Sequence, residues 1–407
     1  MTDYKKQVNL TGWLVFLIAF IVYFFSAERS GSLWDCGEFI LGAYKLQVVH
    51  PPGAPLFLLV GRMFAWLGDI LSSNPEDIAF AVNMMSSLST AFAAAFVAWS
   101  TIILSKMALV GRGGEIEDNG ARIAVLGSGL IAGLATAFCS SIWFSAVEGE
   151  VYAMSFFFTT LTFWSAIKWY NLPDTRDSDR WLVFTVYAAG LSIGVHLLSI
   201  LTFPALALFY YFKKYEKHTI KGAGIAVFLG AVAMYIIQKG VIVGIPAMWS
   251  AFELFCVNTL GLPFHSGIFP TLLVLGALFY FGLRYAHKKQ SHILQLSLVS
   301  LLMAVMAFST YGAVVIRANA NTPINMNEPS DAMRLLPYLN REQYGERPLL
   351  RGPHFDAKPV TVDATPRYGR VDDKYEIVDE KLTYEYANKD KILFPRIGHT
   401  DRASLHR

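Results

Sequence analysis

Long apolar runs, separated by short polar connections, recur along the chain from residue 11 to residue 316. A helix that crosses the hydrocarbon core of a bilayer needs about 20 predominantly apolar residues. The pattern predicts about nine crossings, at residues 11–27, 79–105, 122–144, 151–168, 181–197, 199–212, 222–243, 269–285 and 293–316. We therefore expect an all-α polytopic membrane protein, with a transmembrane domain over residues 1–316.

One further apolar stretch, Pro55–Leu67, differs from these runs. Arg62 interrupts it, and prolines crowd its start at Pro51 and Pro52. Such a segment favours a helix that lies in the membrane interface. We place it in a large first outer loop, between the first and second crossings.

The distribution of lysine and arginine tests this topology. If the N-terminus is cytoplasmic, the outer connections hold only Arg29, Lys45, Arg62 and Lys239, and all other cations up to residue 316 fall on the inner side. Cytoplasmic loops of membrane proteins carry such an excess of positive charge. A crossing at residues 55–67 would invert every later loop. The charge pattern therefore predicts that the first loop and the tail face outward.

Composition supports a membrane protein and separates the C-terminal tail from it. Hydrophobic residues make up 54% of the chain and charged residues 16%, whereas soluble domains average about 25% charged residues. Residues 317–407 are polar, with period-two alternation at 358–363 and 375–379 that indicates short strands. We expect this tail to be a small extracytoplasmic segment. The first apolar run is long for a signal peptide, so we expect a retained anchor.

The three cysteines, Cys36, Cys139 and Cys256, have no metal-like spacing. Cys36 and Cys256 both fall on the predicted outer side. A disulfide between them stays open, because sequence cannot supply the geometry that a disulfide requires.

Two acids in the first outer loop are the strongest candidates for chemistry. Asp35 and Glu38 are three residues apart and share a face if this stretch is helical. A carboxylate at a membrane surface must be hydrated, paired with a cation or involved in function. Either acid could instead cap an interfacial helix. The aromatic residues Trp34 and Phe39 make this segment poorly suited to keep an interfacial helix hydrated. We therefore favour a catalytic role for Asp35 and Glu38.

Other polar residues gather at the predicted outer face, in connections and at helix ends. The candidate binding residues are His50, Glu148, Glu150, His196, Asn258, Arg317 and Asn319. Each has a structural alternative. A histidine near a helix end, such as His196, is more often capped or packed, and Arg317 could be an interfacial anchor. For Glu148 and Glu150 the two interpretations are evenly balanced.

Four motifs together resemble a known group of enzymes. They are Trp34–Glu38, His50–Pro55, Glu148–Glu150 and the Arg-Ala-Asn-Ala-Asn segment from Arg317. Over residues 1–330 the chain resembles membrane glycosyltransferases of the GT-C superfamily. Within that superfamily it is most similar to the bacterial uncharacterised-domain family related to the vertebrate transmembrane protein O-mannosyltransferase.

This resemblance implies a multi-pass enzyme of the cytoplasmic (inner) membrane, with its active site on the periplasmic face. It would transfer a sugar, with mannose expected, from a polyprenyl-phosphate carrier to a Ser or Thr hydroxyl of an exported protein. Asp35, or less favourably Glu38, resembles the general base, and Arg317 resembles the cation that meets the lipid phosphate. The implied partners are the lipid-linked donor, the acceptor and membrane lipids, with no nucleic acid.

The resemblance implies no cofactor, since mannosyltransferases of this type are generally metal-independent. A divalent metal stays open, because four nearby acids offer suitable oxygen ligands. Family members commonly continue into a longer soluble region, so the resemblance leaves two alternatives for the tail: a truncated form or a minimal form. The stereochemistry of transfer also stays open. Direct displacement by the acceptor hydroxyl would invert the anomeric centre, whereas double displacement would need a second, nucleophilic carboxylate.

Two function classes remain as alternatives. A transporter or channel often shows repeated halves and ionisable groups near the bilayer midplane. Here the ionisable groups cluster at one face, and no second half mirrors the first. A non-catalytic subunit of an envelope complex would use the polar tail as a docking arm. The identities of the sugar and the acceptor stay open.

Overall fold

The computed structural model describes residues 3–72, 74–345 and 348–395. The chain divides into two compact units. The first comprises Met1–Gly244 and Val274–Ser330, and the second comprises Ile245–Leu273 and Asp331–Arg407. The sequence predicts a domain boundary after residue 316, where the chain becomes polar. That boundary stays a prediction.

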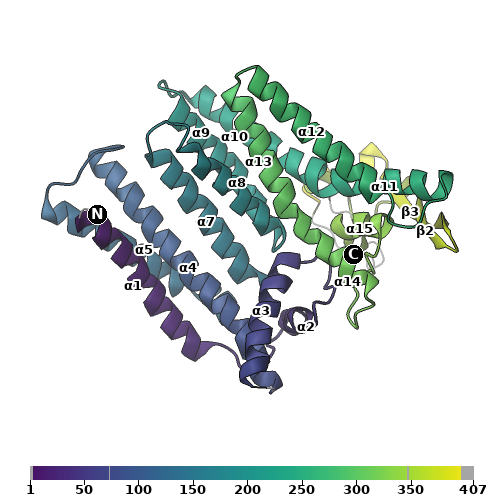
Figure 1. The fold of residues 1–407 in the computed structure, drawn as a ribbon, viewed down its shortest axis with the longest axis horizontal. Coiled ribbons are helices and arrows are strands. Elements are labelled where there is room, and N and C mark those ends of the chain that lie inside the picture. The colour runs from purple at the N-terminus through teal and green to yellow at the C-terminus, as the bar shows by residue number, and fades with distance from the viewer. Residues whose placement is uncertain (1–2, 73, 346–347, 396–407) are drawn as a thin grey trace. The chain divides into compact units, whose positions relative to one another are not determined.

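The first unit is helical (Figure 1). Its helices are α1 (Asp3–Ser26), α2 (Cys36–Lys45), α3 (Pro55–Leu71), α4 (Pro75–Val110), α5 (Asn119–Ala137), α6 (Ser140–Ala146), α7 (Val151–Asn171), α8 (Asp179–Ile193), η1 (Leu197–Thr202), α9 (Phe203–Lys214), α10 (Ile220–Ile236), η2 (Ile237–Val243), α13 (His292–Phe308), η4 (Ser309–Tyr311) and α14 (Gly312–Asn319).

Helix α4, with 36 residues, packs against α1, α3, α5 and α7. Small side chains make this close packing possible. Ala94 and Ala98 of α4 are fully buried, and a side chain at Gly133 of α5 would lie only 3.0 Å from the Cβ of Ala98. At the other end of α4, Val82 and Met85 join Phe39 and Phe57 in a buried cluster that packs α2 and α3.

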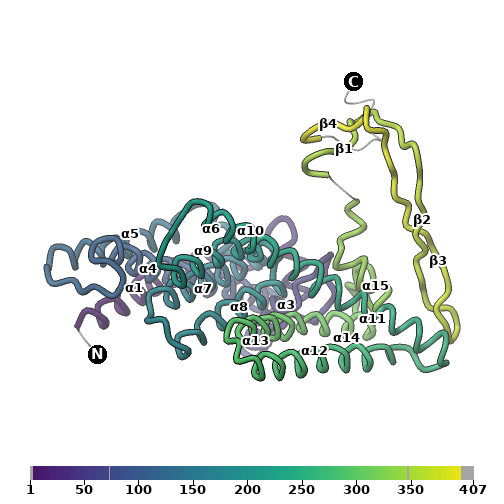
Figure 2. The backbone as a smooth tube through the Cα atoms, turned by 90° about the horizontal axis from the view of Figure 1, so that it is seen from above, coloured from purple at the N-terminus to yellow at the C-terminus, as the bar shows by residue number. Residues whose placement is uncertain are grey.

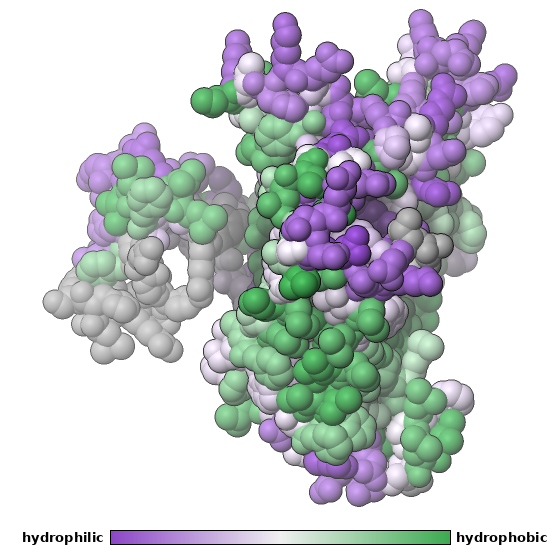
Figure 3. All heavy atoms as spheres, turned by 90° about the vertical axis from the view of Figure 1, so that its left-hand side faces the viewer, coloured by the Kyte–Doolittle hydropathy of each residue, from purple (hydrophilic) through white to green (hydrophobic). Residues whose placement is uncertain are grey.

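Seven helical segments in the described part of the chain are long and apolar enough to cross a membrane. They are Asp3–Ser26, Pro75–Val110, Asn119–Ala137, Leu197–Lys214, Ile220–Thr259, Ile268–Lys288 and His292–Asn319. Each overlaps a predicted crossing, and large side chains such as Phe25 and Ile131 are exposed on them. The face in Figure 3 accordingly shows a broad hydrophobic area beside hydrophilic groups. The prediction of an all-α polytopic membrane protein is confirmed.

The other two predicted crossings, 151–168 and 181–197, fold as helices α7 and α8 but fall outside these seven segments. Helix α8 has 15 residues, and a helix of that length spans only about 22 Å, less than a hydrocarbon core of about 30 Å. Helix α7 is longer, but it buries the hydroxyl residues Ser155, Thr162 and Ser165 against its neighbours. Those polar positions lower its hydropathy.

The segment predicted to lie in the interface forms helix α3. Its Arg62 donates a hydrogen bond from a guanidinium nitrogen to the backbone carbonyl of Tyr44, just before the end of α2. The guanidinium carbon also lies 5.5 Å from the centre of the Tyr44 ring. The cation that interrupts the apolar pattern therefore joins α3 to α2. Its position relative to a bilayer stays a prediction.

The second unit combines short helices with two pairs of strands. Its elements are α11 (Gly244–Leu254) after its first residue, η3 (Phe255–Thr259), the start of α12 (Ile268–Lys288), α15 (Ala332–Leu339), η5 (Glu342–Tyr344), β1 (Arg351–Pro353), β2 (Pro359–Val371), β3 (Lys374–Tyr386), η6 (Asn388–Asp390) and β4 (Lys391–Leu393). The rest of α12, from Val274, belongs to the first unit. The chain is helical from Gly244 through Thr259, and Cys256 and Val257 of η3 are buried.

Strands β2 and β3 form an antiparallel hairpin in which Val371 pairs with Lys374. Figure 2 shows the two strands side by side along their length. The predicted strands at 358–363 and 375–379 overlap this hairpin, so the prediction of strands there is confirmed. Strands β1 and β4 form a second antiparallel pair. All three cysteines are free.

Candidate active site

Asp35 occupies the position that precedes helix α2. Its side chain makes no capping hydrogen bond, so the structural alternative of a helix cap does not account for it. The side chain is 56% exposed, and its Oδ2 lies 4.0 Å from Nε2 of His50. The carboxylate of Asp35 is therefore accessible, with an imidazole beside it.

Glu38, one turn further along α2, is held from two directions by His50. The backbone nitrogen of His50 donates to Oε1 of Glu38 at 2.7 Å, and Nδ1 of His50 lies 2.9 Å from Oε2. The chain turns sharply after His50, where Gly53 adopts a φ of 80° that favours glycine. The nitrogen of Gly53 donates back to the carbonyl of His50. This turn brings His50 between the two acids.

The contacts between His50 and Glu38 shift the pKa of both side chains. A hydrogen bond with Glu38 raises the pKa of His50 against the effect of burial, and the charges of Glu38, Asp35 and Glu150 raise it further. Burial alone would raise the pKa of Glu38, but its hydrogen bonds and charge interaction with His50 outweigh that and lower it. The pair therefore favours a carboxylate beside a protonated imidazole.

The predicted Glu148–Glu150 motif lies near these residues. Ser32 donates a hydrogen bond from its hydroxyl to Glu148. Glu150 caps helix α7 by accepting from the nitrogen of Val151 at 2.9 Å. Glu150 is only 6% exposed, and burial, with the charges of Asp35 and Glu148, raises its pKa to about 7. The two acids of this motif thus differ in environment.

Gly149 allows this motif to approach two helices. A Cβ at Gly149 would lie 2.9 Å from Oδ1 of Asn83 in α4 and 2.9 Å from Cγ1 of Ile40 in α2. Real Cβ atoms essentially never lie that close to other atoms, because hard-sphere repulsion prevents it. Because glycine has no side chain, the turn that carries Glu148 and Glu150 can pack closely against α2 and α4.

Asp35, Glu38 and His50 also form a group that could hold a metal ion. One ligand atom from each lies within 4.8 Å of the others. Two carboxylates and one imidazole suit several divalent cations. However, Nδ1 of His50 is already engaged by Glu38. The expectation of a metal-independent site stays a prediction.

The remaining predicted binding residues in the first unit have structural contacts of their own. Nδ1 of His196 accepts from the nitrogen of Leu198 and caps η1. Its ring centre lies 5.4 Å from that of Tyr152. Asn319 donates from its side chain to the carbonyls of Val315 and Ser330. Their roles in binding stay predictions.

Arg317 lies at the far end of α2 from the acids. Its Nε donates to the carbonyl of Leu46 at 2.6 Å, and a terminal nitrogen donates to that of Lys45 at 3.0 Å. Because α2 has ten residues, these carbonyls lie about 15 Å or more along the helix from Asp35. In this arrangement the guanidinium stabilises the C-terminal end of α2. Its contact with a lipid phosphate stays a prediction.

Asn258 belongs to the second unit and has partners there. Its side-chain nitrogen donates to the carbonyl of Tyr375 at 2.8 Å, and its Oδ1 accepts from the nitrogen of Tyr375 at 2.9 Å. The side chain of Asn258 therefore fastens η3 to strand β3. A role of Asn258 in substrate binding stays a prediction.

Two residues that position the first loop, Asn83 and Ser32, were not among the predicted site residues. Asn83 is fully buried in α4 and donates to the carbonyls of Glu28 and Ser30, at 2.7 and 3.2 Å. Ser32 donates a hydrogen bond from its hydroxyl to Glu148. Asn83 carried a usable signal, because a polar residue inside an apolar span is costly and often functional. Ser32 carried none, since serines are common in loops.

Comparison with known proteins places the acids within a recognised domain. Residues 35–219 match the family described as the N-terminal domain of protein O-mannosyl-transferase TMEM260. This part of the chain is similar to the TMEM260 family. The range matched to this family contains Asp35, Glu38 and His50, together with Glu148, Glu150 and His196. The three other candidates lie beyond residue 219. Residues 345–406 match a family of unknown function, DUF8416.

Two curated relatives show the same similarity to TMEM260 proteins. The chain is 27% identical over 177 residues to protein O-mannosyl-transferase tmem260 of Dictyostelium discoideum, which covers 44% of this chain and 19% of the relative. It is 24% identical over 179 residues to protein O-mannosyl-transferase TMEM260 of Mus musculus, covering 44% of this chain and 22% of the relative. The matched part is thus about a fifth of these relatives. No solved structure matches the chain.

Proposed function

We propose that this protein is a membrane glycosyltransferase that moves mannose from a polyprenyl-phosphate carrier to a Ser or Thr hydroxyl of an exported protein. The observation that carries the proposal is the group formed by Asp35, His50 and Glu38 in the first loop. It combines an accessible carboxylate with an imidazole that is held by a second acid. The names of the TMEM260 relatives support the reaction type.

In this mechanism Asp35 is the general base. A Ser or Thr hydroxyl is a weak nucleophile, so a carboxylate within hydrogen-bond reach takes its proton as the oxygen attacks the anomeric carbon. The bond from that carbon to the phosphate oxygen breaks, and the lipid phosphate leaves as an anion. The proton ends on Asp35. Direct displacement of this kind inverts the anomeric centre.

His50 supplies positive charge beside the reacting atoms. A raised pKa favours its imidazolium form, which would stabilise the negative charge that develops on the leaving phosphate. Glu38 acts through His50 as a positioning residue, because it binds both the backbone nitrogen and Nδ1 of that histidine. The acceptor faces Asp35 and the donor phosphate faces His50.

The test is transfer of label from radiolabelled polyprenyl-phosphate-mannose to a Ser/Thr-containing peptide by the purified protein. We expect Asp35→Asn to lower transfer by about 10²- to 10⁴-fold, the usual contribution of a general base. Because Asp35 is 56% exposed and caps nothing, the variant should fold normally. Glu76→Gln is the matched control, since Glu76 is an exposed acid at the start of α4.

The outcomes separate the parts of the proposal. Transfer retained by Asp35→Asn would remove Asp35 from the mechanism. Label appearing on a glycan or a lipid instead of the peptide would keep the glycosyltransferase and reject the protein acceptor.

A chelator tests the metal question in the same assay. We expect EDTA to leave the rate unchanged, because the imidazolium of His50 already supplies the positive charge. A rate that falls with EDTA and returns with added Mg²⁺ or Mn²⁺ would instead assign Asp35, Glu38 and His50 as metal ligands.

A further inference from the structure

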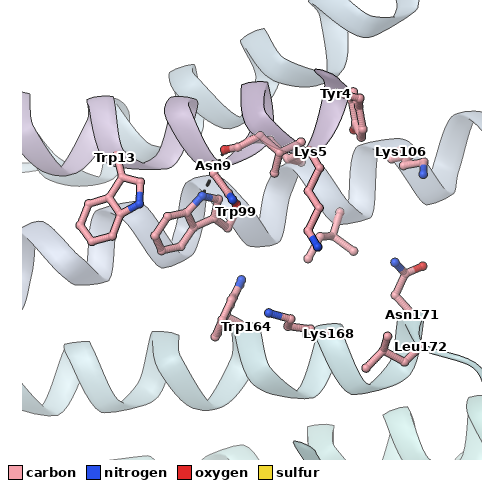
Figure 4. A pocket seen from close by; sticks show the side chains of 13 residues that line it. Tyr4, Lys5, Asn9, Trp13, Trp99, Lys106, Trp164, Lys168, Asn171 and Leu172 are labelled. Carbon is pink, nitrogen blue, oxygen red and sulfur yellow. Dashed lines mark hydrogen bonds between the residues drawn. The ribbon is translucent and has the colours of Figure 1, made fainter. Parts of the chain in front are cut away.

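A cavity lies between helices α1, α4 and α7, away from the candidate active site (Figure 4). Its volume is about 630 Å³. Three lysines line it, Lys5 from α1, Lys106 from α4 and Lys168 from α7, together with Trp13, Trp99 and Trp164. None of these six residues takes part in the proposed sugar transfer.

The cavity and the acids lie at opposite ends of the same helices. Lys5 is near the start of α1, whereas the loop with Asp35 follows its last residue, Ser26. A helix rises about 1.5 Å per residue, so these two ends of α1 are about 32 Å apart. That length matches a hydrocarbon core of about 30 Å. The cavity therefore opens at the membrane interface opposite the acids, which the positive-inside pattern makes the cytoplasmic one.

The lysines bring positive charge to this cavity, and Nζ of Lys106 lies 5.4 Å from the ring centre of Tyr4. Within the described part of the chain, no carboxylate oxygen lies within 4.0 Å of the ammonium group of Lys5, Lys106 or Lys168. Figure 4 shows Lys5 extending from α1 toward α7, where Lys168 is attached. Nζ of Lys168 lies 4.6 Å from the ring centre of Trp164 and 4.2 Å from that of Trp181. Like charges held in one recess repel each other, so the arrangement favours an anion between them.

Lysines at a helix end often extend only to reach water. Three features separate this cavity from that common case. The lysines come from three different helices, they line the same recess, and its other wall is aromatic. Trp99 lies between Trp13 and Trp164, with ring centres 5.8 and 6.0 Å apart. Trp13 is 49% exposed, so the aromatic wall continues from the lysines to the outer surface of the helices.

We propose that this cavity binds an anionic phospholipid of the cytoplasmic leaflet. Its phosphate would lie among Lys5, Lys106 and Lys168, and one acyl chain would follow the tryptophan wall past Trp13. An amphiphile fits because the cavity has a cationic part and an apolar part. A net negative headgroup is required, since a zwitterionic lipid carries its own cation beside the phosphate. The proposal uses the predicted orientation but does not depend on sugar transfer.

Native mass spectrometry of the detergent-purified full chain tests the site. The probes are phosphatidylglycerol, phosphatidylcholine of the same acyl composition, inorganic phosphate and polyprenyl phosphate. We expect phosphatidylglycerol to bind more tightly than the others. The triple variant Lys5→Gln, Lys106→Gln, Lys168→Gln should bind phosphatidylglycerol at least about tenfold more weakly, because each lysine near an anionic lipid contributes to attraction.

Two control variants isolate the cavity from general surface charge. Lys6→Gln, Lys217→Gln, Lys221→Gln removes three exposed cations of the same predicted side that do not line the cavity. It should bind phosphatidylglycerol as the wild type does. Replacing Lys5, Lys106 and Lys168 by arginine keeps the charge and should retain most of the binding. Equal losses in the two glutamine variants would overturn the site.

Other results would also overturn the proposal. Tighter binding of polyprenyl phosphate than phosphatidylglycerol would assign the cavity to the carrier lipid, and binding of inorganic phosphate alone would reject a lipid ligand.

If the glutamine variant fails to fold, fluorescence of the wild type in vesicles gives an independent measurement. Phosphatidylglycerol with brominated chains should then quench tryptophan emission more than brominated phosphatidylcholine at equal mole fraction. The difference should be smaller in Trp13→Phe, Trp99→Phe, because both rings line the cavity. Equal quenching by the two lipids would contradict the proposal.

Discussion

Asp35 and Glu38 are chemically equivalent carboxylates one helical turn apart, but their surroundings give them different capacities. The side chain of Asp35 is 56% exposed, whereas that of Glu38 is 18% exposed and holds His50 through two contacts. An acid that already accepts two hydrogen bonds has less freedom to accept a proton from a substrate. At the residue scale, this difference favours Asp35 as the base.

Glu150 gives the protein a pH dependence that can be measured. Its pKa is raised to about 7, so the folded state binds a proton more tightly than the unfolded chain, in which the group has its ordinary value near 4.5. The resulting stability is fully present below the unfolded pKa and is lost as the pH rises through about 7. We therefore expect the melting temperature in detergent to fall between pH 5 and pH 8.

Glu150→Gln isolates this contribution. Glutamine keeps an oxygen that can accept from the nitrogen of Val151, but it does not titrate, so the decline in melting temperature should be smaller. His50 has the same sign, since its pKa is also raised, and its share should persist in the variant. Identical pH profiles for wild type and variant would show that Glu150 does not titrate in this range.

At the scale of elements, the site depends on close packing of the turn before α7 against α2 and α4. Gly149→Ala would place a Cβ 2.9 Å from Oδ1 of Asn83 and from Cγ1 of Ile40. Relieving such overpacking typically costs about 1–3 kcal/mol. We expect a lower melting temperature and weaker sugar transfer, because Glu148 and Glu150 would shift with the turn.

Gly37→Ala is the matched control for this prediction. Gly37 lies in helix α2, beside the same acids, but a Cβ there would meet nothing within 4 Å. Alanine also favours a helix more than glycine does. This variant should be as stable as the wild type or more so. If Gly149→Ala were as stable as Gly37→Ala, the clash at Gly149 would be relieved at no cost, which would contradict the prediction.

At the scale of the whole molecule, the orientation in the membrane decides which compartment the acids face. In a Cys139→Ala background, we expect Glu76→Cys to react with a membrane-impermeant maleimide in intact cells. Glu115→Cys should react only after the membrane is permeabilised. Both positions are exposed, and the two remaining cysteines are buried. The expectation follows from the excess of lysine and arginine in the connections on the Glu115 side.

The opposite labelling pattern would place the acids in the cytoplasm. It would contradict the proposed transfer to exported proteins, and it would also move the lysine-lined cavity to the outer leaflet. Labelling of both positions in intact cells would indicate that the membrane had been breached, and a cytoplasmic marker protein controls for that.

Sequence pattern predicted the local features of this fold well. The apolar runs indicated the seven membrane-length helical segments, and the alternation at 358–363 and 375–379 indicated the hairpin. The motif from Asp35 to Glu38 and the turn after His50 were also recognisable. These features were predictable because hydropathy and backbone preference act over contiguous residues. Two shorter or more polar helices, α7 and α8, were harder to classify, since their neighbours determine what their faces meet.

Only the tertiary structure decided how distant segments meet. Burial sets the raised pKa of Glu150, a contact with the end of α2 engages Arg317, and Asn83 holds the loop that begins at Glu28. The lysine-lined cavity likewise joins residues 5, 106 and 168. The sequence by itself determined which segments are helical and where acids and cations lie along the chain. Packing between helices determined which of those groups are paired, buried or accessible, because desolvation and contact depend on residues far apart in sequence.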